Sequence, residues 1–258
     1  MPVFCIDIGN SFAHVGLVEN GRVLERHDVA TAHFAAADSE ARAALERAAS
    51  ADGVSYASVV PAATKGLRAL LDEMGLARGS FNLRFDTVRG LGIEYPTPSE
   101  IGQDRLANAV AAQELCGLPC IVVCLGTATV FDVLTKGGYA GGVIAPGFAI
   151  MTDYMHERTA QLPRLEHVES LDVPNAIGRS TVEAMNIGAR AGFKGLVKYT
   201  LGAITAQMEA TGQGIVKVVS TGGNASFFPE GWWPRARHIP DLGMLGLEIA
   251  FRRNKASE

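Results

Sequence analysis

The chain has 258 residues, a formal net charge of −4 and 48% hydrophobic residues, enough for one large or two medium-sized α/β domains with full cores. Because there is no excess of basic residues, we expect no nucleic-acid binding. No segment approaches about 18 consecutive uncharged apolar residues, and Asp7 interrupts the first apolar run. We therefore expect no membrane span, no signal peptide and a cytoplasmic location.

A strand-turn-strand unit occurs twice in the chain. Residues 3–21 and 120–138 each contain an apolar strand, a turn of small residues, a second apolar strand and a glycine turn into a third strand. The copies are offset by 117 positions, so that Gly9 corresponds to Gly126. Two glycine turns that face each other across a cleft can hold a polyphosphate chain through backbone N–H groups. The repeat therefore indicates a kinase-like nucleotide site.

The other expected elements alternate between helices and strands. In the first half they are a strand at 22–26, helices at 34–49 and 65–74, strands at 55–60 and 82–85, a loop at 90–98 and a helix from Ser99 through 112. Ser99 is the expected N-cap of that last helix. In the second half they are three strands within 120–144, helices at 148–160, 180–208 and 243–253, and a strand at 215–220. This order predicts two similar α/β subdomains, residues 1–117 and 118–258, with a cleft at their interface.

The four cysteines are Cys5, Cys116, Cys120 and Cys124. Three of them follow a four-residue spacing, which is compatible with a ligand cluster on a helix. However, the β-type run at 121–123 separates two of them, and Gly117 and Pro119 would interrupt a helix. We therefore interpret the cysteines as small buried side chains in a reducing compartment.

The turn of the first copy carries polar residues that suit phosphate chemistry. Asp7 stands at the end of the first strand, and Gly9, Asn10 and Ser11 follow it. A carboxylate at this point can hold Mg²⁺ against phosphates, directly or through water. A hairpin turn without a special role would show the same residues. The recurrence of the turn at 126–128 favours the phosphate-binding interpretation.

A second group of polar residues, Gly102, Gln103, Asp104 and Arg105, lies at the start of a predicted helix. An acid in the first helical turn is explained by the helix dipole alone, and an adjacent arginine by an exposed surface charge. The functional interpretation makes Asp104 a general base toward an alcohol and Arg105 an anchor for a substrate carboxylate. Both interpretations remain open from these residues.

In combination, these motifs resemble the type III pantothenate kinases of the acetate and sugar kinase/Hsp70/actin superfamily. The resemblance covers nearly the whole chain and rests on seven segments in order. They are 7–11, 58–61, Tyr95 and Pro98 with 102–105, 126–132, 141–147, 180–185 and 221–223. The resemblance implies an α/β fold of two duplicated ribonuclease H-like (actin-like ATPase) subdomains with a central cleft.

The resemblance also implies the reaction, which is ATP-dependent phosphorylation of pantothenate to 4'-phosphopantothenate, the first step of coenzyme A synthesis, by a cytoplasmic homodimer with its substrate pocket near the interface. Asp104 would be the general base. The implied pantothenate-binding residues are Tyr95, Gly102, Gln103, Asp104, Arg105 and Thr181. The implied ATP-binding residues are Asp7, Ile8, Gly9, Asn10, Ser11, Phe12, Ala13, His14 and Thr127, with Asp7 also reaching Mg²⁺ through the phosphates.

Three positions depart from the family pattern, of which Ser11, where threonine is more usual, keeps the hydroxyl. Cys124 stands where the family has an acid that binds an activating monovalent cation, K⁺ or NH₄⁺, and a neutral thiol is a poor ligand for a hard cation. Val130 stands where a threonine is common. We therefore expect a kinase whose cation requirement is altered. The alternative hypothesis is a non-catalytic or cation-independent relative that binds nucleotide or pantothenate and acts in regulation, which the retained Asp7 and Asp104 oppose.

Overall fold

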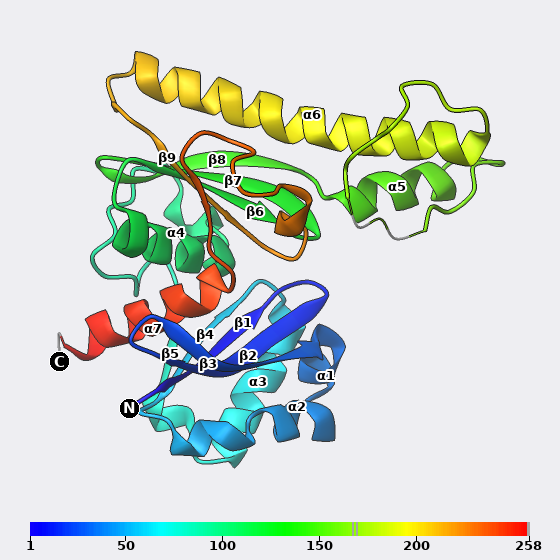
Figure 1. The fold of residues 1–258 in the computed structure, drawn as a ribbon. Helices are drawn as coiled ribbons and strands as arrows, with labels where there is room; N and C mark the ends of the chain where they lie inside the picture. Colours follow the sequence, from blue (N-terminus) through cyan, green and yellow to red (C-terminus); the bar gives the residue numbers. More distant parts are fainter. Residues whose placement is uncertain (167, 169, 257–258) are drawn as a thin grey trace. The chain divides into compact units, whose positions relative to one another are not determined.

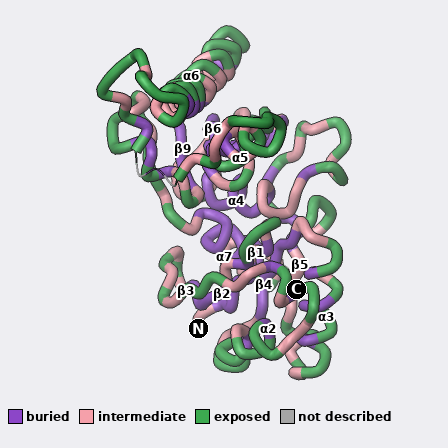
Figure 2. The backbone as a smooth tube through the Cα atoms, turned by 90° about the vertical axis from the view of Figure 1, so that its right-hand side faces the viewer, coloured by how far each residue is buried: buried purple, intermediate pink, exposed green. Residues whose placement is uncertain are grey.

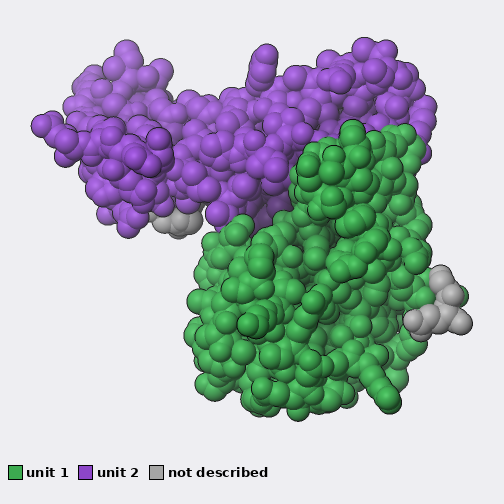
Figure 3. All heavy atoms as spheres, turned by 180° about the vertical axis from the view of Figure 1, so that it is seen from behind, with its two compact units in different colours: residues 1–117, 137–139, 241–258 green, residues 118–136, 140–240 purple. Residues whose placement is uncertain are grey.

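The computed structural model describes residues 1–166, 168 and 170–256. The backbone divides into two compact units, each drawn in its own colour in Figure 3. The first consists of Met1–Gly117, Gly137–Tyr139 and Asp241–Glu258, and the second of Leu118–Lys136 and Ala140–Pro240. The C-terminal helix therefore belongs to the first unit, whereas the sequence-based division assigned it to the second subdomain. That division at residue 117 stays a prediction.

The sheet of the first unit has the strand order β3-β2-β1-β4-β5 (Figure 1). Its strands are β1 Val3–Ile8, β2 Phe12–Glu19, β3 Arg22–Ala30, β4 Val54–Ser58 and β5 Ser80–Asn82. β1, β2 and β3 form an antiparallel meander, and β4 and β5 run parallel to β1. Because β1, β4 and β5 are parallel, their carboxyl ends share one edge of the sheet.

Helices cover both faces of this sheet. α1 Thr31–Ala36, α2 Ser39–Ala44 and α3 Pro61–Glu73 pack on the face formed by alternate residues such as Phe4 and Ile6. α7 Leu242–Lys255 packs on the opposite face and against α4 Gln103–Cys116. The tube in Figure 2 shows buried backbone along β1, β4, α4 and α7. The core of the unit therefore lies on both sides of its central strands.

A buried carboxylate joins α7 to the turn between β2 and β3. Asn20 and Gly21 both have positive φ, 52° and 71°, the backbone geometry of a type I′ hairpin turn. Their N–H groups donate to the side chain of Glu248, at 3.1 and 3.2 Å. Glu248 is only 2% exposed and also pairs with Arg252. A buried acid with these partners fixes the hairpin on the helix.

Two predictions about helices in the first unit were wrong. The single helix expected at 34–49 is broken into α1, α2 and a 3₁₀ helix, Glu46–Ser50. The break occurs because Ala37 adopts the left-handed conformation and the Asp38 side chain caps α2 by accepting from the N–H groups of Glu40 and Ala41.

The second error concerns the start of α4. Ser99 lies within a short 3₁₀ turn, Pro98–Glu100, and the N-cap is Gly102. The extended backbone of Ile101 separates this turn from the helix. The short strand expected at 82–85 is also displaced, because β5 ends at Asn82.

The sheet of the second unit has the order β10-β9-β6-β7-β8. Its strands are β6 Cys120–Leu125, β7 Ala128–Thr135, β8 Gly138–Pro146, β9 Lys217–Thr221 and β10 Ala236–His238. β6 and β7 are antiparallel, whereas β9 and β10 run parallel to β6. β10 has only three residues and was missed in the sequence. In reverse, this order is β8-β7-β6-β9-β10, which matches β3-β2-β1-β4-β5 of the first sheet strand by strand. The predicted duplication is therefore confirmed.

Helices α5 Phe148–Glu157 and α6 Thr181–Ala210 belong to this second unit. Phe148 lies edge-on to Phe193 and Phe227, with ring centroids 5.5 Å apart in both pairs. These rings pack with the sheet residues Ile121 and Val123 in one cluster. The aromatic cluster therefore holds both helices on the sheet.

The cysteines agree only in part with the expectation of small buried side chains. Cys5 and Cys120 are buried, whereas Cys116 and Cys124 are half-buried. Over the described part of the chain, no group of three or more His, Cys, Asp and Glu side chains could hold a metal ion. None of the helices described there has the length and apolar character needed to cross a membrane.

Candidate active site

Asp7 lies one residue before the end of β1 and points to the α7 side of the sheet. A Cβ atom at Gly243, in the first turn of α7, would lie only 2.5 Å from Asp7 Oδ2. Any larger residue at 243 would therefore displace the carboxylate. Asp7 Oδ1 is buried and has no hydrogen-bond partner among the described residues. The backbone thus brings a carboxylate with an unused oxygen to the carboxyl edge of the sheet.

The surroundings of Asp7 disfavour its negative charge. The pKa of Asp7 is raised from 3.8 to about 7, mainly by burial and also by the negative charge of Asp104, while His14 and Arg26 act in the opposite direction. A nearby cation would stabilise the ionised form. Oxygen ligands of this type suit Mg²⁺, so the unused Oδ1 fits a role in holding that ion.

The turn that follows Asp7 is held by α1. Gly9 N–H donates to the carbonyl of Phe12 at 3.0 Å, and the Gly9 carbonyl accepts from Thr31 Oγ1 at 2.7 Å. Thr31 N–H donates to the carbonyl of Ser11 at 3.0 Å. The side chain of Asn10 is exposed. The turn therefore has a fixed backbone whose tip faces outward, as a phosphate-binding turn requires.

His14, opposite Asp7 in the β1–β2 ladder, belongs to an ionic network. Its Nδ1 lies 2.7 Å from Asp28 Oδ1 and 3.1 Å from the Arg26 guanidinium. Arg26 binds Asp28 through two nitrogens, both at 2.8 Å, and also pairs with Asp241. Asp241 is the N-cap of α7. The network links the Asp7–His14 segment to the start of α7, and the sequence had not indicated it.

Asp104 lies in the first turn of α4, next to the N-cap Gly102. Its Oδ1 accepts from the N–H of Arg105 at 2.8 Å. A Cβ atom at Gly102 would lie 2.5 Å from that same oxygen, so glycine is needed for the carboxylate to fold back over the helix start. Burial raises the pKa of Asp104, and Arg105 moderates the increase. A carboxylate with a raised pKa in this position can act as a general base.

Gln103 has a structural role that its sequence motif did not reveal. Its Oε1 accepts from the N–H of Ser58, at the end of β4, and from Asn82 Nδ2, at the end of β5, both at 2.9 Å. Asn82 also donates to the Tyr56 carbonyl at 3.2 Å. The side chain therefore fastens the first turn of α4 to the carboxyl edge of the sheet, beside Asp104.

Arg105 and Tyr95 come together around Tyr139. The Arg105 guanidinium carbon lies 5.6 Å from the centre of the Tyr139 ring, within the range of a cation–π contact. Tyr95 lies edge-on to the same ring, with centroids 6.1 Å apart. Tyr139 is fully buried. It belongs to the first unit and was not predicted, because a tyrosine in a glycine-rich strand has no signature of its own.

The second unit contains the other glycine turn. Gly126 N–H donates to the Ala128 carbonyl at 3.0 Å, and the Thr127 carbonyl accepts from Gly147 N–H at 3.1 Å. Thr127 is exposed. Ile8 pairs with Ala13 in the first hairpin, whereas Leu125 pairs with Thr129 in the second. The second turn is therefore one residue shorter than the first.

Cys124 occupies the place in β6 that Asp7 occupies in β1. It pairs with Val130 on one side and with Thr221 on the other. The thiol is half-buried. The two strand positions are therefore equivalent, with a thiol in the second copy where the first has a carboxylate.

Thr181 is the first residue of α6 and is exposed. Ser180 caps the helix by accepting from Glu183 N–H at 3.2 Å, and Glu183 accepts from Arg179 N–H at 2.8 Å. This arrangement is close to a capping box and explains why the helix begins here.

Within the first unit, the structure brings the Asp7–His14 segment and the start of α4 to one region of the sheet edge, and the effect of Asp104 on the pKa of Asp7 reflects this closeness. Tyr95 is connected to this group through Tyr139 and Arg105. The remaining candidates, Cys124, Thr127 and Thr181, belong to the second unit.

Comparisons with known proteins agree on one family. The family profile described as type III pantothenate kinase matches residues 3–203. A type III pantothenate kinase from Akkermansia muciniphila is 45% identical over 174 residues, 67% of this chain and 69% of the relative. One from Listeria monocytogenes is 34% identical over 266 aligned positions, 98% of each chain.

Solved structures share the fold at low sequence identity. A Campylobacter jejuni protein titled a putative Baf family transcriptional activator has a TM-score of 0.62 at 19% identity, covering 98% of this chain and 99% of that one. A ROK family glucokinase from Streptomyces griseus, solved with glucose and AMPPNP, has a TM-score of 0.54 at 13% identity and covers 98% and 100%. The fold is that of the actin-like ATPase kinases, and the profile match with the curated relatives shows that this chain belongs to the type III pantothenate kinase family.

Proposed function

We propose that this protein transfers the γ-phosphoryl group of ATP to the hydroxyl of pantothenate, giving 4'-phosphopantothenate in the first step of coenzyme A synthesis. The observation that carries the proposal is the placement of Asp104. Its carboxylate lies at the start of α4 with a pKa raised by burial, close enough to Asp7 for the two charges to interact. A kinase needs such a pair, one acid for the acceptor hydroxyl and one for the metal–phosphate side.

In the proposed reaction, Asp104 accepts the proton of the pantothenate hydroxyl as its oxygen attacks the γ-phosphorus. The new O–P bond forms while the bond between the γ-phosphorus and the β–γ bridging oxygen breaks, and ADP leaves with that oxygen. The contact of Asp104 Oδ1 with Arg105 N–H orients the carboxylate. Asp104 therefore acts as general base, and positioning supplies much of the remaining rate.

We assign pantothenate to Tyr95, Gly102, Asp104, Arg105 and Thr181. Arg105 is suited to the substrate carboxylate because its guanidinium is a planar double donor, and Tyr139 supports it through the ring contact at 5.6 Å. We assign Gln103 a positioning role, since its Oε1 is already used by Ser58 and Asn82. This differs from the direct substrate contact expected from the motif.

We assign ATP to the segment from Asp7 to His14, which includes Ile8, Gly9, Asn10, Ser11, Phe12 and Ala13, and to Thr127. Asp7 would hold Mg²⁺ through its unused Oδ1. When bound, Mg²⁺ would neutralise charge on the phosphates. The backbone of the turn at Gly9, held by Thr31, would position the phosphate chain.

We further propose a homodimer that works in the cytoplasm. The proposal is motivated by the family resemblance, and α6 offers the exposed apolar side chains of Val182 and Tyr199, 48% and 81% exposed, as separate candidate contact points.

The direct test of the function is an ADP-release assay with ATP, Mg²⁺ and pantothenate. We expect turnover that depends on pantothenate and ceases when either ATP or Mg²⁺ is omitted. The assay is run with and without K⁺ or NH₄⁺. If pantothenate does not increase the rate of ADP release in any of these conditions, the kinase activity is ruled out. That result would favour a regulatory relative that binds the same ligands.

The same assay addresses Cys124. We expect the rate of the native enzyme to respond weakly to K⁺ or NH₄⁺, because a neutral thiol is a poor ligand for these ions. Cys124→Asp should introduce or strengthen the response, while Cys124→Ser serves as a size-matched variant without a charge. A steep K⁺ dependence of the native enzyme would contradict the expectation. No change in Cys124→Asp would mean that the ion does not bind at this position.

A further inference from the structure

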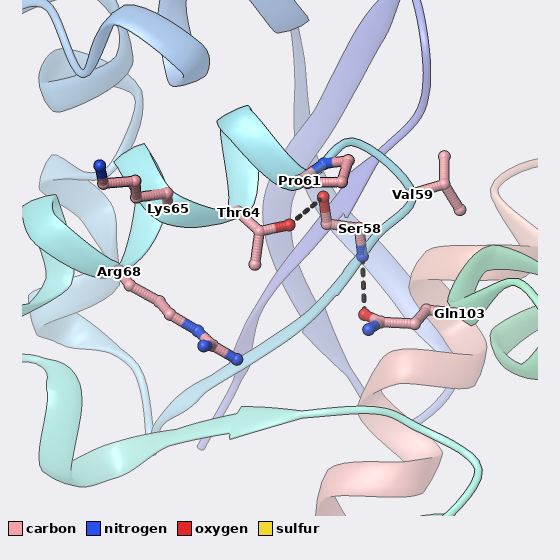
Figure 4. Close-up of a pocket in the computed structure, with 7 residues that line it drawn as sticks. All are labelled: Ser58, Val59, Pro61, Thr64, Lys65, Arg68 and Gln103. Atoms are coloured by element: carbon pink, nitrogen blue, oxygen red, sulfur yellow. Dashed lines mark hydrogen bonds between the residues drawn. The ribbon is translucent and has the colours of Figure 1, made fainter. Parts of the chain in front are cut away.

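A pocket of about 440 Å³ opens in the first unit, at the carboxyl end of β4 and the start of α3. It is lined by Ser58, Val59, Pro61, Thr64, Lys65, Arg68 and Gln103 (Figure 4). Apart from Gln103, none of these residues has a part in the proposed reaction. The pocket therefore needs an explanation of its own.

Two basic side chains of α3 line this pocket. Lys65 and Arg68 are both exposed, and among the described residues neither forms an ion pair with an acid. The Nε of Arg68 donates to the Tyr56 hydroxyl at 3.1 Å, which fixes the guanidinium against the sheet. In Figure 4 the two side chains point in different directions from α3, Lys65 away from Ser58 and Arg68 toward the strands. Their positive charge is available to a ligand.

The start of α3 adds further donors. Pro61 occupies the first turn, and the N-cap residue Val60 gives no side-chain cap. The backbone N–H groups of Ala62 and Ala63 belong to the first turn of α3, where N–H groups have no hydrogen-bond acceptor within the helix itself. The positive end of the helix dipole lies at the same place.

The polar side chains of the pocket are already ordered. Thr64 Oγ1 lies 2.8 Å from Ser58 Oγ, and Ser58 N–H donates to Gln103 Oε1 at 2.9 Å. Because the oxygen of Gln103 is used in this way, its amide nitrogen is the part that remains for a ligand. Two cations with an amide donor suit a doubly charged oxyanion, because charge-assisted hydrogen bonds to phosphate are strong.

We propose that this pocket, which adjoins the start of α4, is a second binding site, for a small phosphate-bearing anion. Lys65 and Arg68 neutralise the two negative charges, and the backbone N–H groups in the first turn of α3 and the amide nitrogen of Gln103 donate to the phosphate oxygens. The shared chemistry is the phosphate dianion, whether it is inorganic or carried by an organic monoester. The proposal does not depend on the reaction proposed above.

The test is a calorimetric titration of the full chain, with Mg²⁺ and a non-hydrolysable ATP analogue present to fill the nucleotide site. Inorganic phosphate and β-glycerol phosphate are the two probes, and they distinguish an inorganic from an organic source. We expect saturable binding that weakens by at least about tenfold, or 1.4 kcal/mol, in the double variant Lys65→Gln/Arg68→Gln. Lys65→Arg keeps the charge and should retain the binding.

A charge-matched control is Arg22→Gln/Arg78→Gln, which removes two exposed positive charges from other parts of the same unit. It should leave binding unchanged within about twofold. Amide NMR shifts of Ala62 and Ala63 on phosphate addition locate the site. Absence of saturable binding, an equal loss in the control variant, or shifts confined to other segments would each overturn the proposal.

Discussion

Replacing Asp104 with asparagine will lower kcat by about 10²–10⁴-fold, the range typical of a lost general base. The amide cannot accept the proton of the pantothenate hydroxyl, but it has the size of the carboxylate and fits beside Gly102. The fold and the KM for ATP should therefore change little. Steady-state kinetics of the ADP-release reaction, with a melting curve for each protein, measure these effects.

The pH profile gives a second readout for Asp104. Because burial raises the pKa of this carboxyl, the native rate should fall on the acid side at a pH above the usual aspartate range, since the protonated form cannot act as a base. Glu100→Gln is the matched control, because Glu100 is an exposed acid of the preceding turn. A loss of kcat in Asp104→Asn no greater than in this control would exclude the general-base role.

The fold was predictable from the sequence because its main signal is repeated. Two copies of a strand-turn-strand unit predicted two central hairpins, and both sheets show them at the expected residues. Local capping was harder to predict. The chain from 34 to 49 has helix-forming composition throughout, but the left-handed Ala37 and the cap at Asp38 divide it. Helix propensity is summed over a whole segment, so it does not reveal the single residue at which one helix ends and the next begins.

The location of α7 also could not be predicted from local pattern. The segment 243–253 was expected to be helical, and it is. Its packing against α4 depends on residues remote in sequence, because a Cβ atom at Gly246 would lie 1.8 Å from the Ala107 carbonyl. Contacts of that type have no signature in a single sequence, although they decide which unit the helix joins.

Motifs in the sequence were enough to propose residues of the candidate site, but not the contacts that hold them in place. Asp104 was proposed from its motif, and burial raises the pKa of its carboxyl. Gln103 belongs to the same motif, but its bonds to Ser58 and Asn82 depend on how the strand ends meet. Tyr139 supports Arg105 from a residue 34 positions later in the chain. Such supporting side chains become visible only in three dimensions.

Replacing Asp7 with asparagine will reduce activity and raise stability at neutral pH. The native carboxyl has a pKa of about 7 in the folded chain and an ordinary value of 3.8. Between these values the folded chain holds a proton that the unfolded chain has released, so the free energy of unfolding falls as the pH rises from about 4 to about 7. Asparagine does not titrate and removes this loss.

Melting curves between pH 5 and pH 8, without nucleotide or metal, test the effect on stability. The melting temperature of Asp7→Asn minus that of the native protein should grow as the pH rises through this range. Asp72→Asn, at an exposed position of α3, is the control and should show a flat difference. A flat difference for Asp7→Asn as well would contradict the raised pKa.

The activity of the same variant should fall by at least about 10–100-fold, because a lost metal contact typically has an effect of this size. Raising the Mg²⁺ concentration should partly restore the rate of Asp7→Asn, but not that of Asp104→Asn. That difference separates the two acids. In the proposed mechanism Asp7 acts on the metal–phosphate side, where a higher ion concentration compensates, whereas Asp104 acts on the proton, where it does not. Without a cation, the buried negative charge of Asp7 lowers the free energy of unfolding. A cation held by the unused oxygen of Asp7 would offset this loss.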